Sequence, residues 1–193
     1  MSFKKALRAV VRVATTNARL AGGKLLHGSR IKFHPATCLA FTDVVELSRK
    51  GTLDFGKGLR TRGHCVFNVQ EEGVLSFGEG VFLNTGCQFN CRMGITVGDG
   101  SEFGPNVFVY DHDHDYRAAG GIKDGDFIYN EVSIGKNCWI GANVILLRGT
   151  ALGDGCVVGA GSVLKGSFPS HALIYQPRSE MIKGFCSSEG DVS

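Results

Sequence analysis

Acidic and imidazole side chains alternate in the segment 111–115, which reads Asp-His-Asp-His-Asp. This segment contains His112 and His114, two of the chain's six histidines. A neutral imidazole accepts a proton near physiological pH, and it also binds metal ions. Three interpretations are therefore open: a catalytic base with its support, a metal site, or a solvated polar turn. In an extended segment both imidazoles would share one face and the aspartates the other.

The composition is that of a soluble globular protein. A length of 193 residues suits one domain, or one domain with an appendage. The 28 glycines against four prolines indicate many backbone positions with positive φ, rather than a disordered tract. Residues 1–32 carry eight basic residues and no acidic one, whereas the rest of the chain carries 13 basic and 18 acidic. A nucleic-acid-binding protein would spread basic charge over its binding fold, so nucleic acid is not an expected partner.

A basic amphipathic helix is predicted over residues 1–28. Its apolar residues recur at helical spacing, namely Phe3, Leu7, Val10, Val11, Ala14 and Ala18. We expect this face to pack on the chain's own domain or on a neighbouring subunit, and contact with a membrane surface is the open alternative. Arg8 and Arg12 interrupt the apolar run, and no stretch approaches transmembrane length. The chain is therefore expected to be cytoplasmic.

An apolar residue returns at every sixth position over most of the chain. The members are Leu53, Leu59, Phe77, Leu83 and Phe89, then, shifted by two residues, Val97 and Phe103, and finally Ile134, Ile140, Leu146, Leu152, Val158 and Leu164. The fourth residue of most hexads is Asn or Gly, types that tolerate the left-handed αL conformation. The fifth is usually small or β-branched. Each hexad thus predicts a short extended segment followed by a tight corner.

Three such segments make a coil of about 18 residues, and coils stack by strand pairing. We predict an all-β solenoid over residues 29–170, a loop over about 111–131 where the pattern fails, and a C-terminal extension over 171–193. Cys87, Cys138 and Cys156 fall at the fifth position and serve as small core residues. Without a paired C-x-x-C motif, the seven cysteines favour neither a disulfide framework nor structural zinc.

The hexads IGKNCW-IGANVI and LGDGCV-VGAGSV resemble those of the hexapeptide-repeat acyltransferases. The resemblance covers roughly residues 30–185. It implies a left-handed parallel β-helix, an exception to the usual right-handed crossover. It also implies a homotrimer whose sites lie between neighbouring prisms.

The stretch GPNVFVYDHDH resembles the matching segment of maltose, galactoside and polysaccharide O-acetyltransferases. Its Asp-His-Asp-His run is similar to that of colanic-acid and capsule O-acetyltransferases. The resemblance implies that His114 is the general base, whereas we expect His112 to contact substrate or solvent. Acetyl transfer from a thioester to a sugar hydroxyl needs a base for the alcohol proton and a hydrogen-bond donor for the oxyanion. Gly141 or Ala142 matches the family segment beside the thioester.

The resemblance also implies a binding site for the acceptor. Asn84 matches a substrate-binding Asn that faces the catalytic His across the trimer interface. Cys91 and Arg92 stand where galactoside-type enzymes carry acidic residues. Arg92 is therefore expected to bind the acceptor, and the change from acidic residues indicates a different or charged acceptor.

Acetyl-CoA is the co-substrate that the resemblance implies, in a groove along the C-terminal coils. Trp139 would flank the thioester or stand as an exposed corner residue. The pantetheine arm would meet the backbone of Gly141, Ala142, Gly159 and Ala160, and the phosphates would meet Lys165, Arg178 and Lys183.

The leading hypothesis is an acetyl-CoA-dependent O-acetyltransferase acting on a sugar in surface polysaccharide synthesis. N-acetylation of an amino sugar or a xenobiotic is an alternative on the same fold, and a non-catalytic scaffold is another. A metalloenzyme resembling the γ-carbonic anhydrases would need a third His about 18 residues from His114. No histidine lies between His114 and His171, so no metal is expected.

Overall fold

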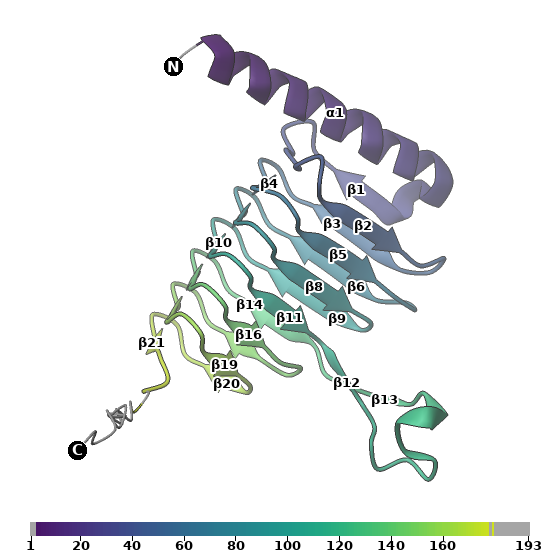
Figure 1. The fold of residues 1–193 in the computed structure, drawn as a ribbon, viewed down its shortest axis with the longest axis vertical. Helices are drawn as coiled ribbons and strands as arrows, with labels where there is room; N and C mark the ends of the chain where they lie inside the picture. Colours follow the sequence, from purple (N-terminus) through teal and green to yellow (C-terminus); the bar gives the residue numbers. More distant parts are fainter. Residues whose placement is uncertain (1–2, 178, 180–193) are drawn as a thin grey trace, which may run out of the picture.

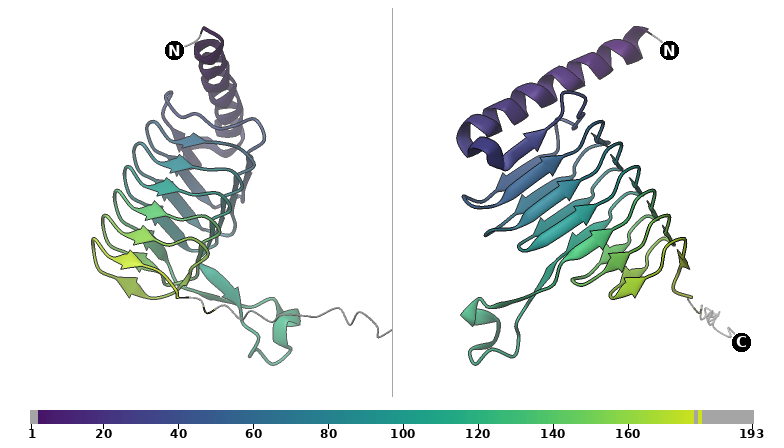
Figure 2. Two further views of the ribbon diagram at one scale, coloured as in Figure 1. Left: turned by 60° about the vertical axis from the view of Figure 1, so that its left-hand side comes forward. Right: turned by 180° about the vertical axis from the view of Figure 1, so that it is seen from behind.

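The computed structural model describes residues 3–177 and 179 (Figure 1). One long helix, α1 (Phe3–His27), and a 3-10 turn, η1 (Gly28–Arg30), precede a stack of parallel strands that wind around a triangular prism (Figures 1 and 2). The strands form three sheets, and the chain passes from sheet A to sheet B to sheet C in each complete coil.

Each sheet takes one short strand from every coil. Sheet A contains β1 (Ile31–Phe33), β3 (Thr52–Phe55), β6 (Val74–Phe77), β9 (Gly94–Val97), β14 (Val132–Ile134), β17 (Ala151–Leu152) and β20 (Ser167–Phe168). Sheet B contains β4 (Arg60–Thr61), β7 (Phe82–Leu83), β10 (Glu102–Phe103), β15 (Trp139–Ile140), β18 (Val157–Val158) and β21 (Leu173–Ile174). Sheet C contains β2 (Val44–Leu47), β5 (Val66–Val69), β8 (Gln88–Cys91), β11 (Phe108–Tyr110), β16 (Ile145–Leu146) and β19 (Val163–Leu164).

The six-residue pattern of the sequence is confirmed as the structural repeat. Every apolar residue of the run is buried in one continuous core. The fourth position of the hexad has φ between 52° and 79° at all nine predicted residues: Gly80, Gly86, Gly100, Asn106, Asn137, Asn143, Gly149, Gly155 and Gly161. The fifth position is buried throughout, and includes the three predicted core cysteines. The corners therefore turn through αL residues, and the small fifth residue fills the space behind them.

The coils narrow along the solenoid. Strands of four residues in sheets A and C line the earlier coils, and two-residue strands line the later ones. The wider section is filled by phenylalanines: Phe67 lies between Phe55 and Phe89, with ring centroids 4.9 and 6.0 Å away. The later core holds aliphatic and cysteine side chains. This change of width explains why the sequence pattern shifts by two residues between Phe89 and Val97.

Helix α1 caps the N-terminal end of the solenoid, but through a face that differs from the predicted one. Thr16 and Leu20 are the buried side chains, and the Thr16 hydroxyl bonds with the backbone of Leu39. The predicted face does not pack on the chain's own domain: Leu7, Val10, Val11, Ala14 and Ala18 are exposed, while the side chain of Phe3 lies outside the described part. The helix packs through this face because Gly23 allows a close approach: a Cβ on Gly23 would stand 3.1 Å from Ile31 Cδ1. Small residues bring the helix against the first coil.

The break in the repeat is an antiparallel hairpin that projects from the prism (Figures 1 and 2). Strand β12 (His112–His114) pairs with β13 (Phe127–Tyr129), so that His112 opposes Tyr129 and His114 opposes Phe127. A 3-10 turn, η2 (Gly121–Asp124), lies at the tip. The segment expected as a loop is thus ordered by strand pairing. At the other end, β21 lies within the segment 171–193 for which an extension is expected.

Candidate active site

Two edges of the prism carry the predicted site residues. The CA edge is the row of turns from sheet C into sheet A, and it includes Arg92, the hairpin 111–131 and Lys165. The BC edge is the row of turns from sheet B into sheet C, and it includes Asn84 and the residues that follow β15 and β18. Sheet C separates the two edges within one chain.

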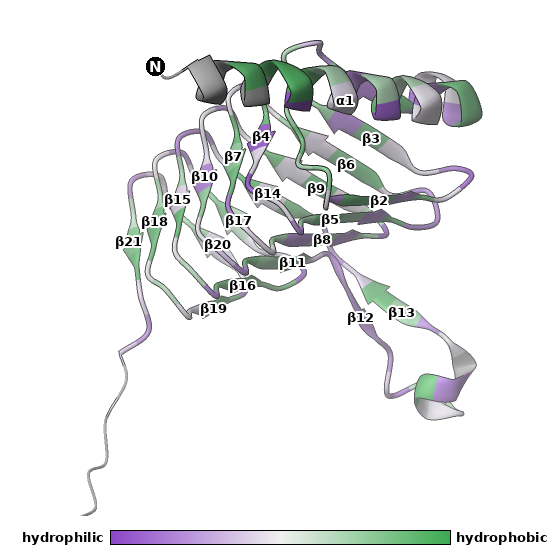
Figure 3. Cartoon of the chain, turned by 45° about the horizontal axis from the view of Figure 1, so that its top comes forward, coloured by the Kyte–Doolittle hydropathy of each residue, from purple (hydrophilic) through white to green (hydrophobic). Residues whose placement is uncertain are grey.

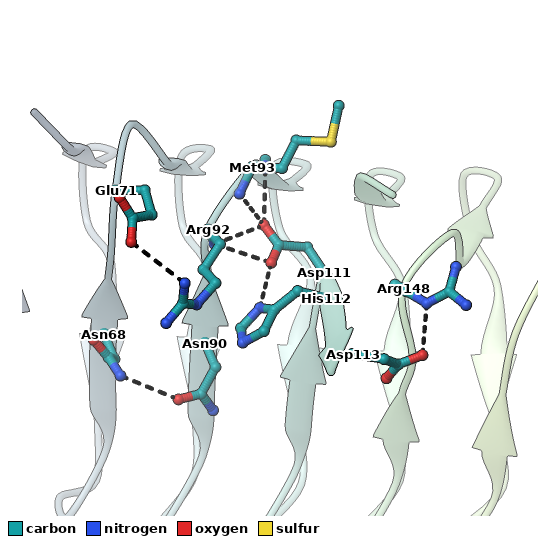
Figure 4. Close-up of polar contacts among 10 residues, drawn as sticks. Asn68, Glu71, Asn90, Arg92, Met93, Asp111, His112, Asp113 and Arg148 are labelled. Carbon is teal, nitrogen blue, oxygen red and sulfur yellow. Dashed lines mark hydrogen bonds and ion pairs between the residues drawn. The ribbon is translucent and has the colours of Figure 1, made fainter. Parts of the chain in front are cut away.

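Asp111 is the anchor of the histidine segment. Its side chain is fully buried, and it accepts hydrogen bonds from the backbone N–H groups of Arg92, Met93 and Gly94 at 2.8–3.0 Å (Figure 4). Its Oδ1 also lies 2.8 Å from Nδ1 of His112. With the proton on Nδ1, the imidazole donates to Asp111 and presents Nε2 as an acceptor. The carboxylate therefore orients His112 while it closes the turn after β8.

Burial by itself raises the pKa of the Asp111 carboxyl. The hydrogen bonds from His112 and from the N–H groups of Arg92 and Met93 outweigh burial, so the net pKa lies below the ordinary value. The carboxylate is thus the stable form of Asp111 at neutral pH.

Phe127 brings the two histidines and Arg92 together. Its ring centroid lies 4.4 Å from that of His114 and 5.5 Å from that of His112. On the same ring, the Arg92 guanidinium carbon stands 3.7 Å from the centroid, a cation–π contact. Asp113 is not part of this cluster. Its Oδ2 forms an ion pair with Nε of Arg148 at 2.5 Å (Figure 4). The imidazoles therefore share one face of β12, as the alternation predicts.

A cleft of about 600 Å³ lies beside this cluster on the CA edge. It is lined by Glu71, Glu72, Arg92, Met93 and Tyr129. The Arg92 side chain is mostly buried, and its contact with Glu71 is long, at 3.4 Å. Its buried Nε has no hydrogen-bond partner. Among the described residues the guanidinium donates only to Glu71, so Arg92 has further N–H groups left for a bound molecule.

Four of the residues expected to hold the donor lie on the BC edge: Gly141, Ala142, Gly159 and Ala160. Trp139 is 60% exposed on the outer face of sheet B. Gly141 follows it, and its N–H bonds to the carbonyl of Val158 in the next coil. Gly159 is engaged in the same way with Ile174. Among the described residues, the N–H groups of Ala142 and Ala160 donate no hydrogen bond. Of the pair Gly141 and Ala142, only Ala142 thus has a free donor for an oxyanion.

Asn84 begins the BC turn two coils before Gly141. Its Oδ1 accepts the N–H of Thr85, whereas its amide NH2 donates to no group of the described structure. One chain therefore groups Asn84 with Trp139, Ala142 and Ala160, and groups Arg92 with the histidines. It does not bring the two groups together. Lys165 lies on the CA edge, and Arg178 and Lys183 lie outside the described residues.

Two residues of the cluster were not among the sequence candidates. Asp111 could have been found, because Val107 and Val109 point inward and the period of two continues to position 111. Phe127 carries no local signal, since only the register of the hairpin sets it opposite His114. No group of three His, Cys, Asp or Glu side chains with metal-binding geometry occurs in residues 3–177 and 179.

Comparison with known proteins agrees with this architecture. Residues 131–165 match the family described as the hexapeptide repeat of succinyl-transferase. This segment of the chain thus carries the hexapeptide repeat of that family. An N-acyltransferase from Bacillus cereus, solved with a dTDP-amino sugar and coenzyme A, superimposes with a TM-score of 0.63 at 16% identity over 79% of this chain and 81% of that one. This match confirms the predicted left-handed parallel β-helix.

Three similar proteins carry names for acetyl transfer. A maltose O-acetyltransferase from Clostridium difficile 630 is 27% identical, with a TM-score of 0.50 over 75% of this chain and 65% of that one. The galactoside O-acetyltransferase of Escherichia coli K12 is 31% identical over 83 residues, 41% of this chain and 38% of that protein. WbbJ of the same strain, a provisionally named lipopolysaccharide biosynthesis O-acetyl transferase, is 33% identical over 104 residues. The match covers 47% of this chain and 50% of that protein. The chain thus spans half or less of these two curated relatives.

Proposed function

We propose that the chain is an acetyl-CoA-dependent O-acetyltransferase whose acceptor is a sugar of surface polysaccharide synthesis. One observation carries the proposal: two imidazoles and an arginine converge on Phe127 where a hexapeptide-repeat solenoid opens into a hairpin. The names of the galactoside enzyme and of WbbJ support acetyl transfer to a sugar hydroxyl. The described cysteines are all free thiols, which fits a reducing cytoplasm.

In this proposal His114 is the general base. Its imidazole is exposed at the projecting edge, where a second chain can reach it, whereas His112 is mostly buried and bonded to Asp111. His114 takes the proton of the acceptor hydroxyl as the oxygen forms its bond to the acetyl carbon. The carbon–sulfur bond of the thioester breaks, and the proton passes to the departing thiolate. The N–H of Ala142 stabilises the charge that develops on the carbonyl oxygen.

The residues on the BC edge fit a thioester with a long, flexible arm. Cβ atoms on Gly141 and Gly159 would stand 2.6 and 3.0 Å from atoms of the next coil. The backbone at these two positions is therefore closely stacked and not covered by a side chain of its own. The exposed ring of Trp139 stands on the strand that leads into this turn. We place the pantetheine arm here, along Ala142 and Ala160, and the acceptor beside Arg92 and Asn84.

The site requires two chains in this proposal. His114 and Arg92 stand on one edge of the prism and Asn84 and Ala142 on another, with the width of sheet C between them. A homotrimer places the CA edge of one chain against the BC edge of the next, which supplies both groups to one site. In this arrangement the chain that supplies His114 and Arg92 also supplies Lys165, which would meet the donor's phosphates.

Release of free thiol from acetyl-CoA tests the proposal over a panel of sugars, sugar nucleotides and amino sugars. We expect turnover with hydroxyl acceptors, and ester formation detected by loss of the product in mild base. Acylation confined to the amine of amino sugars would show N-acetylation instead. Sedimentation equilibrium tests the trimer, and a monomer that retains full turnover would contradict the two-chain site.

A further inference from the structure

The outward face of α1 carries an apolar stripe that nothing in the described structure covers. At 100° per residue, Leu7, Val11, Ala14, Ala18, Ala21 and Leu25 fall on one side of the helix, opposite the buried Thr16 and Leu20. The large side chains of this stripe are more than half exposed, from 52% at Val11 to 90% at Leu25. The stripe therefore faces directly away from the solenoid, over about 27 Å of helix.

The stripe is the outermost surface at this end of the molecule. Helix α1 lies across the end of the prism, and apolar segments recur along it (Figure 3). Two further apolar side chains are 82% exposed at this end: Leu26 of the helix itself and Phe41, whose ring lies 5.8 Å from the Arg19 guanidinium. No part of the described helix is apolar enough over its length to cross a bilayer. The geometry is that of a helix lying in an interface rather than through it.

The charge around the stripe is positive and is not neutralised. Residues 1–32 contain eight basic residues and no acidic one. The guanidinium groups of Arg12, Arg19 and Arg30 donate to backbone carbonyls, which are neutral acceptors. None of the ion pairs among the described residues involves α1. These three arginines hold α1 and η1 on the solenoid, and no acidic side chain of residues 1–32 offsets the positive charge of this end.

We propose that this end of the molecule docks on the surface of an anionic phospholipid bilayer. An anionic bilayer offers phosphate to the cations and an acyl boundary to the stripe, and each basic residue near such a surface adds to the attraction. A second copy of α1 fits less well, because pairing two stripes would bring like charges together. Docking is independent of the acetyl transfer proposed above, but it would bring the site to an acceptor carried on a membrane.

Co-sedimentation of the full chain with vesicles tests this. We expect binding to vesicles of phosphatidylglycerol and phosphatidylcholine to exceed binding to phosphatidylcholine alone by about tenfold, and to weaken as salt is raised. The double substitution Leu7→Asp, Val11→Asp should reduce the bound fraction by about tenfold. The matched control is the double substitution Val74→Asp, Val163→Asp, which places the same charge at exposed apolar residues of sheets A and C and should bind as the unsubstituted chain does.

Three results would overturn the proposal. The first is equal sedimentation of the unsubstituted chain with and without anionic lipid. The second is unchanged binding by the double variant. The third is a fall in the molar mass of the double variant in light scattering, since it would show that the stripe is a contact between copies. Acetyl transfer to soluble sugars is measured in parallel, so a failure of catalysis and a failure of docking are told apart.

Discussion

The imidazole of His114 lies against the ring of Phe127, its partner across the β12–β13 hairpin, with 4.4 Å between centroids. The opposite strand thus holds the proposed base, and the same ring contacts Arg92. Phe127→Leu removes this flat surface and should lower kcat of acetyl transfer about tenfold, because small misplacement of a base is costly. Phe127→Tyr keeps the ring and should retain most of kcat. Equal kcat in the leucine variant would show that the contact does not position His114.

Substitutions distinguish the roles of His112 and His114. His114→Ala should reduce kcat by roughly 10²–10⁴, the usual contribution of a general base, with the KM for acetyl-CoA little changed. His112→Ala should reduce it less, and should also lower thermal stability, because it leaves the buried Asp111 with one partner fewer. Steady-state kinetics with the best acceptor decides. The reverse order of effects would assign the base to His112.

Asp111 predicts a pH dependence of stability. Its pKa in the folded chain is below the ordinary value near 4, so the carboxylate stabilises the fold above about pH 4. That contribution is lost as the pH falls from about 4 through the lower folded pKa. Asp111→Asn should therefore be less stable at pH 6, and the gap to the unsubstituted chain should narrow below pH 4. Urea unfolding followed by circular dichroism from pH 6 to 3 measures it, and a constant gap would contradict it.

The αL corners predict a difference between two small substitutions. Asn137 has φ of 52°, and its Oδ1 lies where a Cβ on Gly100 of the preceding coil would stand. Asn137→Ala should lower the free energy of unfolding by about 1–2 kcal/mol, the cost of αL for an ordinary residue. Asn137→Gly adopts the same φ without that cost and should be close to neutral. Equal stability of the two variants would mean that the corner relaxes.

Trp139 is the only tryptophan of the chain, so its fluorescence tests the proposed donor groove without labelling. Titration with acetyl-CoA should change the emission of the exposed indole, and Trp139→Ala should raise the KM for acetyl-CoA while leaving the KM for the sugar unchanged. Leu173→Ala, a substitution of another exposed residue in sheet B, is the control. Unchanged emission at saturating acetyl-CoA would place the donor elsewhere.

Much of the scaffold could be predicted from the sequence because the solenoid is built from local rules. Leu146 predicts its own burial from its six-residue spacing, and Asn143 predicts its positive φ from its residue type. Both depend on a few neighbours along the chain, which stacking then repeats. The same period of two that buries Val107 and Val109 would have placed Asp111 in the interior.

The packing face of α1 could not be predicted in this way. Val11 and Leu20 are both apolar and lie on different sides of the helix, and periodicity does not say which side meets the solenoid. The small residue Gly23 allows the close approach on the Leu20 side. The contact is long-range, so only the folded chain shows it.

The order of residues is enough to specify the repeat, the corners, the position of the break and the two histidines within it. What those histidines touch depends on the folded chain. Asp111 reaches three N–H groups of the preceding coil, Phe127 meets His114 and Arg92 through the hairpin register, and Asn84 stands on another edge from both. Spacing along the chain fixes local geometry, whereas contacts between coils and across a hairpin arise only when distant segments pack together.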